Sequence, residues 1–266
     1  MSAFRLALAA AGLSAGLTVA AAAERPGALL SCTVVADQAS GAVLVREGTC
    51  DQRFAPMSTF KVPLAVMGFD AGILKSASEP VWAIMPEYAP SKREMAFPEV
   101  DPTSWEENSI VWFSKHLTTL LGEADFARYV AAFGYGNADV SGGLTTAWLM
   151  SSIQISPDEQ VAFLRRMLDH GLPVSATAID LTEAIIPVFP AGDWTVHGKT
   201  GAGRLPDAPG AKGEARPLGW FVGWADRDGR RVVFARMMVA DGPVEGPVSY
   251  LVRDSLLKDL PGLLDN

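Results

Sequence analysis

The stretch Leu218–Ala225, LGWFVGWA, is apolar on both of the faces that alternate along a β-strand. Such a strand must be covered from both sides, so the stretch predicts the centre of a sheet with other elements packed on each face. Strand patterns also occur at Trp194–Thr200 and Arg231–Val239, and near the N-terminus at Cys32–Asp37 and Ala42–Arg46. Strands at both ends of the chain with helices between them predict an α+β fold, an antiparallel sheet flanked by helices with a helical subdomain inserted.

The middle of the chain has mainly helical patterns. The best-marked helix starts at Ser156, which can cap it, while Pro157 takes the first helical position and Glu159 can complete a capping box. Gly171 is expected to end this helix. Further helices are expected at about Ser58–Ala71, Ser109–Leu121, Ala124–Phe133, Ala176–Ile186 and Val248–Leu260.

The chain has 266 residues and no internal repeat or low-complexity linker, which suits one domain of generous size. We expect residues 24–266 to form a single domain. Within it, residues 24–60 and 190–266 are expected to form a sheet subdomain and residues 61–189 a mainly helical one.

The net charge of the chain is −8, from 22 Lys and Arg against 30 Asp and Glu. A polyanion gains nothing from such a surface, so a nucleic-acid partner is excluded. Anionic small molecules are still allowed, because a local lysine or arginine can bind them.

Residues 1–23 have the pattern of a secretory signal peptide. Arg5 is their only charge, an apolar run covers Leu6–Ala22, and Ala21-Ala22-Ala23 is typical of a cleavage site. We therefore expect export to the periplasm with cleavage after Ala23, and no membrane association afterwards. A short membrane anchor is the alternative, although the run is short for a span and rich in Ala and Gly rather than Leu.

Cys32 and Cys50 are the two cysteines of the chain, and both lie after the expected cleavage site. Export permits a disulfide, and the two residues stand at the ends of the expected N-terminal hairpin. A Cys32–Cys50 bridge is therefore expected, with two buried free thiols as the alternative.

The three histidines, His116, His170 and His197, are far apart in the chain, and none belongs to an H-E-x-x-H motif. Neither a zinc site nor a Ser-His-Asp triad is expected, and no metal is predicted. An acyl-transfer enzyme of this sequence would need a base other than histidine.

Ser58-Thr59-Phe60-Lys61 forms an S-x-x-K motif at the start of an expected helix. Positions i and i+3 share a helix face, so the Ser58 hydroxyl would lie beside the Lys61 amine. A serine needs an adjacent base to act as a nucleophile, and a lysine can be that base when burial lowers its pKa. Alone the motif is weak evidence, since S-x-x-K also occurs by chance on surface helices, where the lysine is solvated.

The S-x-x-K motif is followed in order by Ser109-Ile110-Val111, Tyr135-Gly136-Asn137, Trp148 and Lys199-Thr200-Gly201. In this combination the chain resembles the class D β-lactamases, or oxacillinases, over nearly its whole length after the signal pattern. The resemblance implies a DD-peptidase/β-lactamase-like fold. It also implies hydrolysis of β-lactam antibiotics as the activity, with antibiotic resistance as its result.

For catalysis, the resemblance implies that Ser58 is the acylated nucleophile. Lys61 would be carboxylated by CO₂ to N6-carboxylysine and act as general base, and no other cofactor is implied. Ser109 would pass a proton to the leaving nitrogen. Val111 would keep the pocket of the modified lysine apolar, and Trp148 would donate its indole N–H to the carbamate.

For substrate binding, the resemblance implies that Lys199, Thr200 and Gly201 line the site. The backbone N–H groups of Ser58 and Ala202 would form the oxyanion hole. The anchor of the substrate carboxylate follows from no tight motif. Arg253 is our candidate, and the competing arginines are Arg236 and Arg204.

Three other functions compete with this interpretation. A β-lactam-sensing receptor domain would acylate without turnover, and a penicillin-binding transpeptidase or carboxypeptidase would do the same at the cell wall. A secreted non-catalytic binding protein is the third. Steady turnover of a β-lactam separates the enzyme from all of them.

Overall fold

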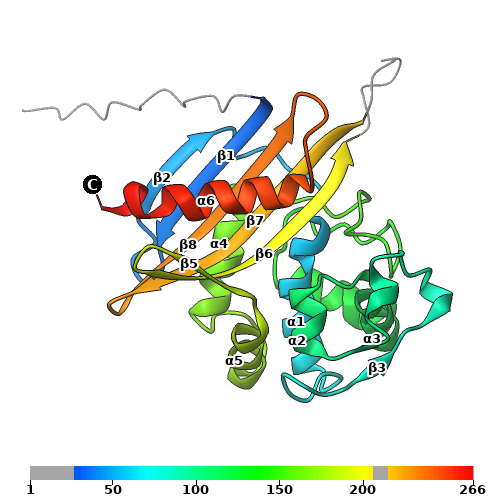
Figure 1. Cartoon of the computed structure of the whole chain (residues 1–266). Helices are drawn as coiled ribbons and strands as arrows, with labels where there is room; N and C mark the ends of the chain where they lie inside the picture. The colour runs from blue at the N-terminus through cyan, green and yellow to red at the C-terminus, as the bar shows by residue number, and fades with distance from the viewer. Residues whose placement is uncertain (1–26, 206–214, 266) are drawn as a thin grey trace, which may run out of the picture.

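The computed structural model describes residues 27–205 and 215–265 (Figure 1). The expected signal peptide lies outside these residues. A six-stranded sheet has the order β2-β1-β8-β7-β6-β5, and every pair of neighbours is antiparallel. Its strands are β1 (Ala28–Asp37), β2 (Val43–Gly48), β5 (Val188–Ala191), β6 (Trp194–Leu205), β7 (Arg216–Arg227) and β8 (Arg230–Ala240).

The helices are α1 (Lys61–Asp70), α2 (Pro102–Glu107), α3 (Val111–Ala132), α4 (Pro157–Leu168), α5 (Ala176–Ile185) and α6 (Val248–Leu264). Short 3₁₀ turns are η1 (Met57–Phe60), η2 (Pro86–Tyr88) and η3 (Glu94–Ala96), and a two-stranded sheet pairs β3 (Trp82–Ala83) with β4 (Glu99–Val100). The α+β architecture predicted from the pattern of elements is confirmed.

Strand β7 has the two buried faces that its sequence predicts. Trp220 and Trp224 are fully buried in a core formed with α1, α3, α4 and α5. Phe221 and Ala225 point to the other face and pack in a second core against α6. Accordingly, α6 lies across one face of the sheet and α4 lies behind the opposite face (Figure 1).

Local sequence rules set several helix ends. The capping box is present at α4, where the Ser156 hydroxyl accepts a hydrogen bond from the Glu159 N–H at 3.2 Å and the Glu159 carboxylate accepts one from the Ser156 N–H at 2.9 Å. The two helices expected around residue 122 are present as two helical segments of α3, separated at Gly122, whose backbone is not helical (φ 76°, ψ 162°). A residue with positive φ interrupts the helical backbone, which explains why the sequence suggests two segments.

Several elements were not expected from the sequence, namely β5, α2, the β3–β4 pair and the turns η2 and η3. Strand β5 forms the edge of the sheet beside β6 and contains Pro190, a residue that argues against a strand except at an edge. Helix α2 has only one and a half turns, and it begins with a capping box of Asp101 and Ser104. Among the described residues, no helix is both long enough and apolar enough to cross a membrane.

Cys32 and Cys50, the pair expected to bridge, are joined by a disulfide with their Cα atoms 5.1 Å apart. Both are buried. Cys32 lies on β1 opposite Gly48 of β2, and Cys50 follows β2 by two residues. The bridge therefore ties the edge hairpin to the segment that leads to η1.

Candidate active site

Ser58 and Lys61 meet where η1 passes into α1. The Lys61 amine donates to the Ser58 hydroxyl at 3.4 Å, so the i, i+3 spacing brings the two groups together as predicted. Lys61 is only 1% exposed. Burial, helped by the positive charge of Lys199, lowers the pKa of Lys61 to about 7. An amine in this environment is largely neutral just above neutral pH.

The Lys199-Thr200-Gly201 motif on β6 contacts the turn before α3, which contains Ser109. The Lys199 amine donates to the Ser109 hydroxyl at 3.0 Å and to the Thr200 carbonyl at 3.3 Å. Lys199 is 2% exposed, and burial lowers its pKa to about 8. Ser109 has a positive φ of 54°, which turns the chain into the start of α3. Two residues 90 positions apart are thus in direct contact.

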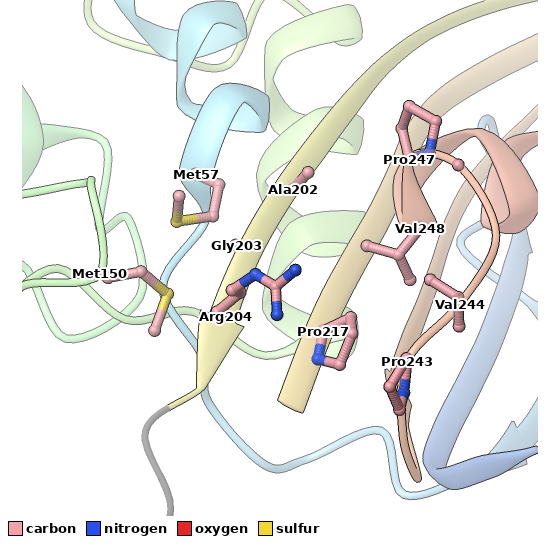
Figure 2. A pocket seen from close by; sticks show the side chains of 11 residues that line it. Met57, Met150, Ala202, Gly203, Arg204, Pro217, Pro243, Val244, Pro247 and Val248 are labelled. Carbon is pink, nitrogen blue, oxygen red and sulfur yellow. The ribbon is translucent and has the colours of Figure 1, made fainter. Parts of the chain in front are cut away.

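Strand β6 approaches η1 closely because Gly201 has no side chain. A Cβ at Gly201 would lie 2.8 Å from the Pro56 carbonyl oxygen, just before the nucleophile turn. This approach places Ala202 beside Met57 at a hollow of about 480 Å³, which we call the first hollow (Figure 2). Its other lining residues are Met150, Gly203, Arg204, Pro217, Pro243, Val244, Gly246, Pro247 and Val248.

Trp148 lies on the other side of the nucleophile turn. Its ring stacks on Phe60, with the ring centroids 5.4 Å apart, and its carbonyl accepts a hydrogen bond from the Met57 N–H at 3.2 Å. Phe126 packs against it edge-on at 6.1 Å. Trp148 is 1% exposed and Phe60 is 0% exposed, so these rings form a buried apolar cluster next to Lys61 in the chain.

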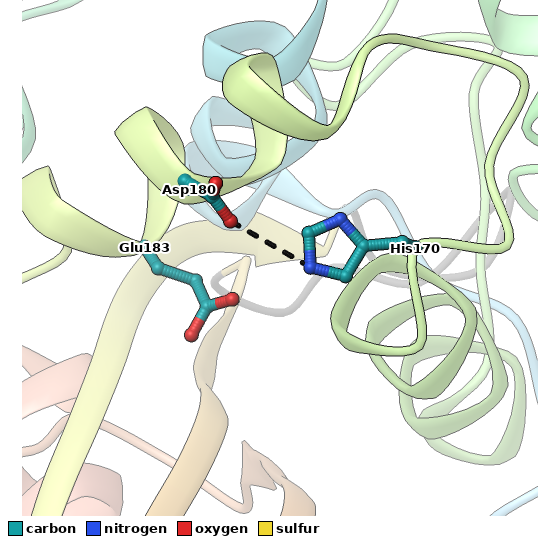
Figure 3. A group of neighbouring side chains, drawn as sticks. All are labelled: His170, Asp180 and Glu183. Carbon is teal, nitrogen blue, oxygen red and sulfur yellow. Dashed lines mark ion pairs between the residues drawn. The ribbon is translucent and has the colours of Figure 1, made fainter.

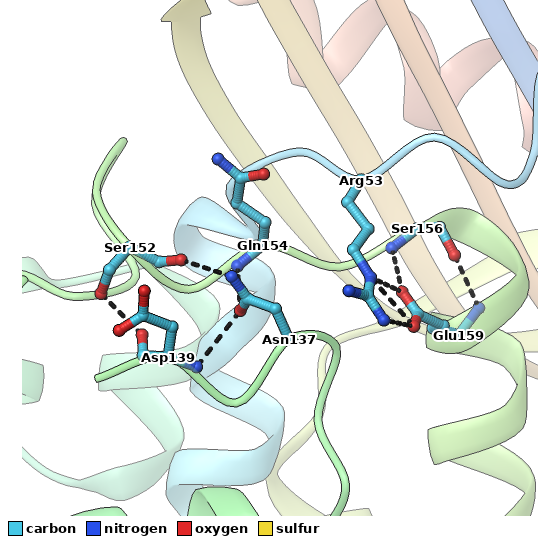
Figure 4. Close-up of polar contacts among 7 residues, drawn as sticks. All are labelled: Arg53, Asn137, Asp139, Ser152, Gln154, Ser156 and Glu159. Atoms are coloured by element: carbon cyan, nitrogen blue, oxygen red, sulfur yellow. Dashed lines mark hydrogen bonds and ion pairs between the residues drawn. The ribbon is translucent and has the colours of Figure 1, made fainter. Parts of the chain in front are cut away.

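Asn137 holds the loop that carries Trp148. Its side-chain amide donates to the Ser152 carbonyl at 2.8 Å and accepts from the Gln154 N–H at 2.9 Å (Figure 4). The preceding Gly136 has a φ of 58°, and a Cβ there would collide with the Gln154 carbonyl oxygen. The Tyr135-Gly136-Asn137 motif therefore acts on the site through the conformation of this loop.

Arg253 and the β6 motif share a second hollow of about 360 Å³, which Ser109, Lys199 and Thr200 also line. The Arg253 guanidinium lies 4.5 Å from the centroid of the Tyr250 ring and is ion-paired with Asp254 at 2.7 Å. Its role as carboxylate anchor stays a prediction. The second hollow also contains Glu106.

The two competing arginines have different positions. Arg236 on β8 is 2% exposed, donates to the Thr33 hydroxyl at 3.0 Å and is ion-paired with Asp259 at 2.9 Å. These contacts make it a structural residue that joins the sheet to α6. Arg204 lines the first hollow, where Figure 2 shows its guanidinium beside Pro217.

Two buried carboxylates of this region were missed in the sequence. Glu94 accepts hydrogen bonds from the Ser91 N–H at 2.8 Å, the Ser91 hydroxyl at 2.7 Å, and the N–H groups of Val111 and Trp112 at 2.5 and 3.4 Å. It therefore caps α3 and fixes Val111, although it lies in the loop-rich segment. Glu106 is 0% exposed, and neither of its carboxylate oxygens has a hydrogen-bond partner among the described residues.

Each of the three histidines contacts residues other than Ser58 and Lys61. His116 packs on Trp82, and His197 stacks on Trp224 with the centroids 5.1 Å apart. His170 lies 3.6 Å from Asp180, and these two with Glu183 are the one group among the described residues whose geometry could hold a metal ion (Figure 3).

Glu183 of this group is already ion-paired with Arg231 at 2.8 Å. His170 and Asp180 are exposed, at 42% and 65% of their side chains. A metal ion would have to compete with the guanidinium for the carboxylate, so the group is adequately explained as a surface ion-pair network.

Comparison with known proteins agrees with this geometry. Residues 31–259 match the family model of the penicillin binding protein transpeptidase domain, which defines the class of the fold and of its serine–lysine site. The chain is 46% identical over 261 residues to β-lactamase OXA-9 of Klebsiella pneumoniae, covering 96% of this chain and 95% of the relative. It is 33% identical over 220 residues to β-lactamase OXA-1 of Escherichia coli, covering 79% and 76%.

Among solved structures, the class D β-lactamase OXA-427 superposes with a TM-score of 0.77 at 35% identity, covering 88% of this chain and 98% of that one. The chain therefore belongs to the class D β-lactamases, enzymes that hydrolyse β-lactam antibiotics.

Proposed function

We propose that this chain hydrolyses the β-lactam amide bond through an acyl-enzyme on Ser58, with carboxylated Lys61 as the general base. The observation that carries the proposal is the contact between the Ser58 hydroxyl and the buried Lys61 amine. Burial holds the pKa of Lys61 at about 7, so the amine is available as a base or for reaction with CO₂. Serine needs such an adjacent base to attack an amide.

Lys61 is the residue that would hold the carboxyl group. CO₂ reacts with a neutral amine, and Lys61 is desolvated, since it is only 1% exposed. It directly follows Phe60, on whose ring Trp148 stacks. When bound, the group supplies a basic carboxylate oxygen to the Ser58 hydroxyl. Trp148 is proposed to donate its indole N–H to this carboxylate, and Val111 to keep the pocket apolar.

The other residues divide between proton transfer and binding. Because Lys199 donates to the Ser109 oxygen, the Ser109 hydroxyl proton remains available for the leaving nitrogen. Lys199, with a pKa of about 8, is mostly cationic at neutral pH and favours the substrate carboxylate nearby. Thr200, Gly201 and Arg253 complete the binding side.

The oxyanion hole is proposed to consist of the backbone N–H groups of Ser58 and Ala202. Residues of η1 and β6 lie against each other at Gly201, which brings these two segments within reach of one carbonyl oxygen. N–H donors preorganised in this way stabilise the negative charge that develops on the lactam oxygen.

We also propose that the enzyme acts in the periplasm after removal of residues 1–23. The signal-peptide pattern of these residues supports this location, and so does the disulfide, because disulfides persist in oxidising compartments. The mass of the exported protein tests it, since cleavage after Ala23 predicts a chain that begins at Glu24.

The main test uses purified protein and a chromogenic cephalosporin. Steady turnover is expected, whereas a single stoichiometric burst would indicate a sensor domain or a transpeptidase instead. Mass spectrometry after rapid quenching should find an adduct on the wild type and on Ser78→Ala, an exposed serine outside the site. The same adduct on Ser58→Ala would refute the assignment of the nucleophile.

A further inference from the structure

The Glu106 side chain carries a buried carboxyl group at the same hollow as Lys199, and neither of its oxygens has a hydrogen-bond partner among the described residues. It lies at the end of α2, is 0% exposed, and belongs to the second hollow together with Ser109 and Lys199. A buried carboxylate normally has partners for both oxygens, because an unpaired buried charge is costly. The absence of partners therefore requires an explanation.

The charges that act on Glu106 come from two other elements. Lys61 of α1 and Lys199 of β6 both favour its ionised form, and burial opposes them. Arg93 acts on both lysines, and Glu94 acts on Lys61 with the opposite sign. The three buried groups Lys61, Lys199 and Glu106 thus influence one another electrostatically, and a net charge left uncompensated among them would be costly.

Carboxylation of Lys61 changes this total. Before it, a neutral Lys61, a cationic Lys199 and an anionic Glu106 sum to zero. The reaction forms a C–N bond between CO₂ and the amine, breaks one N–H bond and leaves a negative charge on the new carboxylate. Unless the released proton stays in the site, the buried pocket becomes net negative.

We propose that Glu106 accepts the proton that Lys61 loses on carboxylation, so that the pocket is neutral before and after the reaction. The balance is Lys61-NH₂ + CO₂ + Glu106-COO⁻ giving Lys61-NH-COO⁻ + Glu106-COOH. This inference rests on the carboxylation of Lys61 proposed above. It explains why the Glu106 carboxyl is fully buried without a hydrogen-bond partner among the described residues, since burial favours its neutral form.

The acid–base properties of the residues are consistent with this exchange. Burial raises the pKa of Glu106 to about 7, and that of Lys61 is lowered to about 7. Above this pH Glu106 is ionised and Lys61 is neutral, which is the state ready to react. A new negative charge on Lys61 raises the proton affinity of Glu106 further, because like charges disfavour ionisation.

The test measures how the affinity of Lys61 for CO₂ depends on pH. Wild type, Glu106→Gln and Glu107→Gln are equilibrated at a fixed pressure of ¹³CO₂ between pH 7.5 and 9, and the carbamate is counted by ¹³C NMR. Glutamine keeps the shape of glutamate but cannot take up a proton. Glu107 is the matched control, since it is the next residue, lines the same hollow and is exposed.

Each proton released to solvent makes the affinity rise about tenfold per pH unit. In Glu106→Gln the affinity of Lys61 for CO₂ should therefore rise about tenfold more per pH unit than in wild type or Glu107→Gln. Because Glu106 raises the pKa of Lys199, the charge of Lys199 is followed by ¹⁵N NMR in all three proteins, and any proton that Lys199 takes up is subtracted from the slope. The same slope in Glu106→Gln and wild type would refute the role of Glu106.

Two outcomes keep the test decisive if Glu106→Gln does not fold. The wild type alone should show no rise in affinity with pH, and a full tenfold rise per unit would refute the proposal. The absence of a ¹³C carbamate signal in a fully active wild type would instead refute the carboxylation of Lys61. The two proposals therefore fail in different ways.

Discussion

Replacing Glu94 by glutamine is expected to destabilise the helix that follows the Ser109 turn. The carboxylate of Glu94 is 4% exposed and accepts four hydrogen bonds, two of them from the first N–H groups of α3. The residue before α3, Ile110, has no side chain that can cap it. Glu94 therefore supplies from a distant loop the cap that the helix lacks.

The magnitude follows from the bonds that change. Hydrogen bonds to a charged group contribute about 1.5–3 kcal/mol each, and a lost helix cap costs about 0.5–2 kcal/mol. Glutamine keeps one acceptor oxygen but loses the charge, so we expect Glu94→Gln to lower the free energy of unfolding by about 2–4 kcal/mol. A domain with a typical stability of about 5–15 kcal/mol still folds.

The effect should depend on pH in a defined direction. Burial raises the pKa of Glu94, but the hydrogen bonds from Ser91, Val111 and Trp112 outweigh it and hold the pKa below the ordinary value of 4.5. A carboxyl with a lowered pKa contributes stability that is fully present above its unfolded pKa and is lost as pH falls through its folded pKa. The difference between wild type and Glu94→Gln should thus be full at pH 7 and shrink below pH 4.5.

Urea unfolding at pH 7 and at pH 4 measures both effects. Glu99→Gln is the control, because Glu99 is an exposed glutamate of β4 in the same region of the chain. It should change the free energy of unfolding by less than about 0.5 kcal/mol. Equal unfolding midpoints for Glu94→Gln and Glu99→Gln at pH 7 would refute the capping role. Turnover should fall as well in Glu94→Gln, because the N–H groups of Val111 and Trp112, which Glu94 holds, directly follow the turn with Ser109.

Three further changes test the surroundings of the site. Removing the Cys32–Cys50 bridge, which spans 18 positions, should lower stability by about 3 kcal/mol and the melting temperature by about 6–12 °C, while initial turnover persists; an unchanged calorimetric melt under reductant contradicts this. Trp148→Phe keeps an aromatic ring against Phe60 but removes the indole N–H, so full activity should need more bicarbonate; an unchanged bicarbonate titration contradicts the donor role. Asn137→Ala removes both hydrogen bonds to the Trp148 loop and should cost about 1–3 kcal/mol in urea unfolding, together with faster amide exchange there; exchange equal to wild type contradicts the clamp.

The elements that could be predicted from the sequence depend on neighbours a few positions apart. The two apolar faces of β7, the Ser156–Glu159 capping box and the Ser58–Lys61 pair all arise from strand or helix periodicity. Such patterns act within one element, so they are readable before any tertiary contact is known. The order of the motifs along the chain then added the resemblance to class D β-lactamases, which family comparison confirms.

Other features were decided only when distant segments packed together. Lys199 reaches Ser109 across 90 positions, and Glu94 caps a helix that begins 17 residues later. Nothing near Glu106 in the sequence marks it as buried, because its burial comes from the packing of α2 against distant segments such as α5.

A glutamate in a short polar helix is normally solvated, and only the surrounding structure removes its water. The low-dielectric surroundings then lower the pKa of Lys61 and raise that of Glu106. The sequence by itself therefore determined the pairing of Ser58 with Lys61, but it did not show that Glu106 is buried near these groups. Their protonation states were decided by the tertiary structure, because desolvation and the distance between charges are properties of the packed fold.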